Sequence, residues 1–203
     1  MVKEIRKEAL MTFNVEFLHP LQGETPPPSP DQSERLAGLR DCLRAARNLD
    51  EAFDLLAADF ETDIPFDRLG LAEITDGGHR LTALRVASTH SLRWETGESR
   101  PLLGSSLEPM IREHAVRIIH DLKHYQSLRP SSLSTKRLIE EGMRSSLALP
   151  IYRNDSPIGV LFVTRTDPDA YQAKHAGILA ALSPAIDEAF GRLLAETSLA
   201  KKT

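Results

Sequence analysis

The chain has 203 residues, of which 41% are hydrophobic and 27% are charged, and its formal net charge is −4. This length and composition are typical of one globular domain with a substantial core and exclude a largely disordered chain. The negative net charge supplies no basic footprint, so direct binding to nucleic acid is not expected.

Cysteine content and hydropathy indicate the compartment. The single cysteine, Cys42, excludes an internal disulfide framework and a multi-cysteine zinc site. No apolar run approaches the roughly 20 residues that are needed to cross a bilayer, and residues 1–10 lack the hydrophobic region of a signal peptide. We therefore expect a cytoplasmic protein without membrane insertion.

The first 30 residues are predicted to be an N-terminal extension and linker. Residues 1–11 have spacing compatible with a short amphipathic helix, and residues 20–30 are rich in proline, which cannot sustain a helix. The folded domain is expected over residues 31–197, with a short tail at 198–203.

Two helices are predicted to precede the first strand. Asp31 and Ser33 are both competent N-caps, and leucines at helical spacing follow them, so the first helix is expected over residues 32–47. Asp50 can cap a second helix, which Pro65 ends.

The middle of the chain is predicted to contain a hairpin, a short helix and a strand. Residues 66–75 and 80–88 are strand candidates around a glycine-containing turn, and a polar loop holding Trp94 follows. Ser105 with Glu108 has the pattern of a capping box for a short helix. Residues 116–122 are expected to form the next strand.

The C-terminal part is predicted to form a lid, a second hairpin and a closing helix. Residues 123–133 are irregular and polar, and a short helix capped by Ser134 ends at Gly142. Residues 146–152 and 158–163 read as paired strands, with an alternating first strand and a second strand that is apolar on both faces. The helix over residues 169–196 is expected to kink or restart near Ser183, because Pro184 removes one backbone hydrogen bond.

This second hairpin carries a resemblance to a known family. Its elements are Gly142, Ser145, the apolar run 147–150 ending in proline, a polar turn, the run 158–161 and a long helix. In this order the chain resembles the C-terminal half of a GAF domain, and the whole of residues 31–196 is similar to the GAF order of elements. The resemblance implies an α+β fold with a central antiparallel sheet of about six strands. N- and C-terminal helices would cover one face, and a ligand pocket would lie under lid segments on the other.

A small-molecule pocket between the sheet and the lid is therefore expected. The candidate ligand-binding residues are Trp94, His120, Asp121, His124, Tyr125, Arg144, Ser145 and Ser146. Arg144 can form paired hydrogen bonds with a carboxylate or phosphate, Asp121 can orient Arg144 or accept from a ligand, and an aromatic ring can stack on the ligand. Alternatively, Arg144 and Asp121 pair with each other or with loop backbone.

The sequence gives less support for a cofactor or a catalytic site than for a ligand pocket. The spacing of His114, His120 and His124 fits no metal motif, although haem on one axial histidine, known in some GAF proteins, stays open. Bilin attachment in the family uses a cysteine at the pocket, whereas Cys42 is expected at a buried or half-buried position on the first helix. The family's cyclic-nucleotide signature, a Gly-x-Ser-x-Gly elbow and a Walker loop are all absent, and no catalytic residue is predicted.

These features predict a sensory or regulatory domain of a bacterial signal-transduction protein, such as a histidine kinase, a sigma-54-type activator or a cyclase. A small ligand would bias the pairing of the terminal helices, which in the family commonly form a dimer, and any catalysis would reside in an effector domain. Two alternatives stay open: a ligand-free dimerisation or protein-interaction module, and a haem-binding gas or redox sensor.

Overall fold

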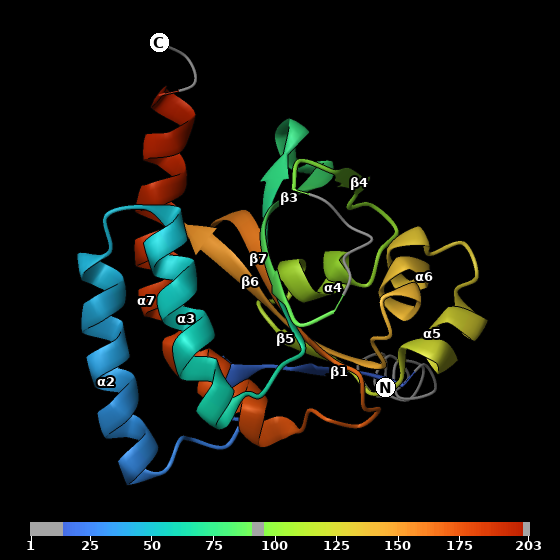
Figure 1. The fold of residues 1–203 in the computed structure, drawn as a ribbon, viewed down its shortest axis with the longest axis horizontal. Helices are drawn as coiled ribbons and strands as arrows, with labels where there is room; N and C mark the ends of the chain where they lie inside the picture. The colour runs from blue at the N-terminus through green and yellow to red at the C-terminus, as the bar shows by residue number, and fades with distance from the viewer. Residues whose placement is uncertain (1–13, 91–95, 201–203) are drawn as a thin grey trace.

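The computed structural model describes residues 14–90 and 96–200, and it shows a sheet covered by helices on both faces (Figure 1). All seven strands of this sheet pair antiparallel, in the order β1-β5-β6-β7-β2-β3-β4. The strands are β1 (Val15–Leu18), β2 (Arg68–Thr75), β3 (Arg80–Ser88), β4 (Ser99–Pro101), β5 (Val116–Ile119), β6 (Ser145–Arg153) and β7 (Ser156–Arg165). The predicted α+β fold is confirmed, with one strand more than expected.

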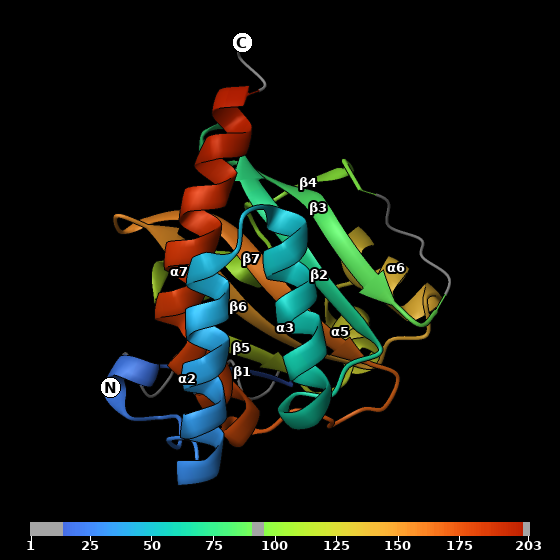
Figure 2. The ribbon, with the colours of Figure 1, turned by 60° about the vertical axis from the view of Figure 1, so that its left-hand side comes forward.

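The helices divide into two groups. Three long helices, α2 (Pro30–Ala45), α3 (Leu49–Asp63) and α7 (Ala173–Ala200), lie together against one face of the sheet (Figure 2). Three short helices, α4 (Leu107–Arg112), α5 (Leu122–Leu128) and α6 (Leu133–Glu140), lie on the opposite face, and we call them the lid helices (Figure 1). Short 3₁₀ turns lie at Pro20–Gln22 and Asp76–Gly78.

The second hairpin forms as predicted, and the structure places it at the centre of the sheet. Leu147, Leu149 and Ile151 of β6 face the core under the long helices, while Ala148 packs on the lid side. Strand β7 is the middle strand and contributes side chains to both cores, which accounts for its apolar residues on both faces. Burial on both faces fixes the register, because a slip of one residue would exchange the two faces.

The N-terminal extension contributes to the sheet. Residues 15–18, assigned to the extension from the sequence, form β1 and pair with β5. The linker then leads to α2, where Ser29 and Gln32 form a capping box, so that the helix begins before the caps predicted at Asp31 and Ser33. The helix predicted within residues 1–11 lies outside the described residues.

Several local predictions need correction. Asn48, rather than Asp50, caps α3 by accepting from the Glu51 N–H at 2.9 Å. The segment predicted to be irregular contains α5, and α7 begins only at Ala173. Helix α7 also continues through Pro184 without a restart, because the packed apolar residues on either side outweigh the loss of one backbone hydrogen bond.

Two further positions differ from expectation. The capping box of Ser105 and Glu108 does not form: the Ser105 hydroxyl accepts from the Leu107 N–H, and the Glu108 carboxylate accepts from the Gly104 N–H. Cys42 is exposed on α2 rather than buried, because the buried stripe of this helix runs through Leu36, Leu39 and Leu43.

The linker crosses α7 closely at Gly177. A Cβ at this position would overlap the carbonyl oxygen of Pro26 and lie 3.2 Å from its carbonyl carbon. Only a glycine therefore lets the linker lie directly on the helix.

We expect Gly177→Ala to lower the free energy of unfolding by about 1–3 kcal/mol, because backbone must move to admit the methyl group. Gly38→Ala on α2 is the matched control: its Cβ meets nothing within 4 Å, so this variant should gain up to about 1 kcal/mol from helix propensity. Urea denaturation measures both values. Equal effects of the two substitutions would contradict the close crossing.

Candidate functional site

A cavity lies between the sheet and the lid helices, on the face opposite α2, α3 and α7. Its volume is about 80 Å³, which is room for several water molecules or one small solute. Strands β2, β3, β5, β6 and β7 supply one wall, and β4 with the lid helices supplies the other. The predicted location of the pocket agrees with this cavity.

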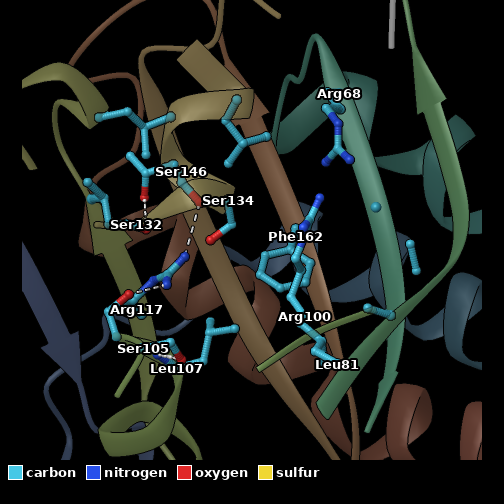
Figure 3. A pocket seen from close by; sticks show the side chains of 18 of the residues that line it. Arg68, Leu81, Arg100, Ser105, Leu107, Arg117, Ser132, Ser134, Ser146 and Phe162 are labelled. Carbon is cyan, nitrogen blue, oxygen red and sulfur yellow. Dashed lines mark hydrogen bonds between the residues drawn. The ribbon is translucent and has the colours of Figure 1, made fainter. Parts of the chain in front are cut away.

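Arg117 of β5 is the central polar residue of the cavity. Within the strand, Val116 and Ile118 face the core of the long helices, so alternation turns Arg117 toward the lid. Its Nη1 donates to the Ser106 hydroxyl at 2.7 Å, and its Nη2 donates to the Ser146 hydroxyl at 3.3 Å (Figure 3). Burial lowers the pKa of the Arg117 guanidinium to about 10, which leaves it charged at neutral pH.

Arg68 of β2 enters the same cavity but has a counter-ion (Figure 3). Its Nε lies 3.0 Å from Oε2 of Glu141, and the two side chains are only 5% and 1% exposed. Burial lowers the pKa of Arg68, and the Glu141 carboxylate opposes that shift. Gly70 makes room for this guanidinium, because a Cβ there would lie 3.1 Å from Nη1 of Arg68.

A third arginine closes the edge of the cavity. Arg100 of β4 lines it, and its Nη2 lies 3.1 Å from Oε2 of Glu98. Arg137 of α6 pairs with the same carboxylate. These ion pairs connect the edge strand to the lid helices.

The predicted ligand-binding residues are divided by the fold. Tyr125 and Ser146 line the cavity. Ser145 points to the other face of β6 and is fully buried, and its hydroxyl has no hydrogen-bond partner among the described residues. Trp94 lies outside the described residues.

The remaining candidates lie beside the cavity rather than in its lining. Arg144 and Asp121 form the ion pair that the sequence left open as an alternative, with Nη2–Oδ2 at 2.7 Å and Nε–Oδ1 at 3.1 Å. Each partner shifts the pKa of the other, lowering that of Asp121 and raising that of Arg144. His120 contacts Glu16 and Asp169, and His124 is exposed on α5.

Sequence reasoning missed the arginines of the cavity. Arg117 stands alone within the apolar run 115–119, and this single cation in a buried strand was the available signal. No sequence pattern predicts the pairing of Arg68 with Glu141, because the two residues are distant in the chain. Glu141 also follows a short helix whose sequence predicts an exposed position.

Comparison with known proteins decides the family. A sequence model described as "GAF domain" matches residues 46–190, which is most of the chain. The chain belongs to the GAF domain family. No curated protein sequence matches it significantly.

Solved structures agree with the assignment of this GAF domain. The GAF domain of a two-component sensor histidine kinase from Bacillus halodurans is 18% identical, with a TM-score of 0.59, covering 77% of this chain and 99% of that one. That of an Acinetobacter phosphoenolpyruvate-protein phosphotransferase is 15% identical, with a TM-score of 0.64 and coverages of 83% and 97%. A phycoerythrobilin-bound GAF domain from a cyanobacterial phytochrome is 15% identical, with a TM-score of 0.60 and coverages of 81% and 99%. At these identities the likeness concerns the fold.

The cavity does not fit a tetrapyrrole. Its volume of about 80 Å³ is below the roughly 300–1,000 Å³ of pockets for drug-sized ligands. Its described lining contains neither cysteine nor histidine, and His114 instead stacks on Tyr152 with ring centroids 4.2 Å apart. Neither a bilin nor haem is therefore favoured as its occupant.

A chain of hydrogen bonds connects the lid of this GAF domain to its closing helix. The Tyr152 hydroxyl donates to the carbonyl oxygen of Ile111 on α4 at 2.5 Å, and the Tyr152 N–H donates to Oδ1 of Asp187 on α7 at 2.8 Å. Helix α4 also carries Leu107 of the cavity lining. Burial raises the pKa of Asp187 to about 6, although the bond from Tyr152 opposes the rise.

We expect Asp187→Asn to gain stability relative to the wild type as pH rises from about 4 to about 6. The native state holds the Asp187 proton more tightly than the unfolded chain, so the wild type loses this contribution over that interval. The asparagine keeps an oxygen that can accept from Tyr152. Denaturant unfolding at several pH values measures the difference in unfolding free energy between the variant and the wild type. Above about pH 6 this difference should stay constant up to about pH 7. A difference independent of pH would contradict the raised pKa.

No helix in the part of the chain that the structure describes combines the length and apolar character needed to span a bilayer.

Proposed function

We propose that this GAF domain is the sensory input domain of a bacterial signal-transduction protein, such as a histidine kinase, a sigma-54-type activator or a cyclase. A small molecule would bind in the cavity under the lid helices and alter the position of α4. The observation that carries the proposal is the path from α4 through Tyr152 to Asp187 on α7, which connects the cavity to the opposite face of the sheet.

The terminal helices are suited to carry the signal. Helix α7 packs against β6, β5, α2 and α3, and its C-terminal end projects beyond the sheet (Figures 1 and 2). We infer that α2 and α7 form a homodimer interface and act on an effector domain, in the same or another chain, that holds any catalytic activity. Ligand binding would act by population shift between two arrangements of α7.

The cavity favours a sensory domain over a purely structural dimerisation module. Such a module needs no internal space, whereas this cavity is lined by hydroxyls and guanidinium groups that are costly to bury.

Native mass spectrometry tests the proposal directly. The full chain, purified without added ligand, should show a mass above that of the polypeptide under native conditions, and the excess should disappear after denaturation. Adding the released molecule back should change amide hydrogen exchange in α7. Binding without any change in α7 or α2 would contradict the signalling role.

We expect Tyr152→Phe to separate binding from signalling. The variant keeps the ring that stacks on His114 and loses the hydroxyl that reaches Ile111, at a cost of about 1 kcal/mol in unfolding free energy. Ligand affinity should be retained, while the ligand-induced change in α7 exchange should fall. Tyr171→Phe is the matched control, because its hydroxyl also donates to one carbonyl, that of Pro65, outside this path. Equal loss of the α7 response in both variants would refute the path.

A further inference from the structure

Arg117 is a buried charge without a buried counter-charge. The residue is 5% exposed, and its guanidinium donates to the hydroxyls of Ser106 and Ser146. Among the residues that the structure describes, its Nε has no hydrogen-bond partner, and no carboxylate forms an ion pair with it. Arg68, which is equally buried in the same cavity, has Glu141 as its counter-ion.

An arrangement of this kind is costly without an additional partner. Removing an ion from water costs several kcal/mol even after relaxation, and buried charges in proteins are usually paired. The hydroxyls of Ser106 and Ser146 offset part of this cost, but as neutral groups they cannot balance the charge. The cavity therefore has a place for a negative group beside Arg117.

The polar side chains around Arg117 can donate hydrogen bonds to a ligand. Ser106 and Ser146 accept from Arg117, which leaves their own hydroxyl hydrogens for a further acceptor. Ser134 and Arg100 also line the cavity, and none of its described lining residues is Asp or Glu (Figure 3). Such a set of donors is complementary to an oxyanion.

We propose that the cavity binds a small oxyanion, the carboxylate or phosphate group of a short organic acid or the free inorganic ion, with Arg117 as its principal counter-ion. This assignment rests on the proposed function and names its ligand class. The apolar wall of Leu81, Leu107, Ile119 and Phe162 suits a short hydrocarbon portion, and the volume of about 80 Å³ limits the ligand to a few heavy atoms.

Paired probes test the charge requirement in the full chain. Acetate and propionate are compared with the neutral acetamide and propionamide, and phosphate and sulfate with sodium chloride at equal ionic strength. Thermal unfolding should show a saturable rise in Tm with at least one oxyanion and none with the amides. Comparing the organic carboxylates with phosphate and sulfate shows whether the site prefers an organic acid or a free inorganic ion. A response to no oxyanion, or an equal response to an acid and its amide, overturns the proposal.

Arg117→Met tests the counter-ion. This variant should weaken binding of the responding anion about ten- to hundredfold by calorimetric titration. In anion-free buffer its Tm should equal or exceed that of the wild type, because an unpaired buried charge is replaced by an apolar chain of similar length. Arg117→Lys should keep part of the affinity. Unchanged affinity in Arg117→Met overturns the assignment.

Arg112→Met is the matched control, since Arg112 lies on α4 near the cavity but is exposed and paired with Glu113. It should bind the anion like the wild type, and a loss equal to that of Arg117→Met would indicate general surface electrostatics and overturn the proposal. If native mass spectrometry instead identifies a neutral co-purified molecule, the oxyanion assignment fails while the sensory proposal stands.

Discussion

The structure depends on a sheet that is buried on both faces. The central hairpin of β6 and β7 sends apolar side chains to each side, so neither face can be left in water, and two independent layers must cover it. The long helices form a continuous apolar layer on one side. The short lid helices cover the other side less completely, and the polar cavity lies in the space they leave.

This division places the larger apolar core and the cavity on opposite faces of the sheet. The core under α2, α3 and α7 contains most of the large buried side chains, whereas the lid side has two smaller apolar clusters interrupted by buried arginines and hydroxyls. Segments with few buried apolar contacts open at lower free energy than a continuous core. A lid of short helices held partly by ion pairs is therefore suited to respond to a ligand, while the opposite face holds the fold.

A polar contact at the end of the central hairpin connects the two faces of the sheet. Tyr152 is near the end of β6, where it reaches the lid through its hydroxyl and α7 through its backbone. The half-buried Asp187 on α7 accepts the hydrogen bond from the Tyr152 N–H, and its raised pKa reflects the cost of placing a carboxylate at this junction. A movement of α4 would thus have a short route to the helix whose end projects from the domain.

The sequence by itself determined the elements whose pattern is local: the two hairpins, the long amphipathic helices and the GAF order, because periodicity and turn residues act over a few positions. It did not reveal β1, since a four-residue edge strand is stabilised by pairing with β5 about a hundred residues away. The site divided in the same way. Tyr125 and Ser146, chosen from their place in the predicted lid and hairpin, line the cavity. Arg117, Arg68 and Glu141 are brought together only by tertiary packing, because burial of a charge depends on what covers it and not on its neighbours in the chain.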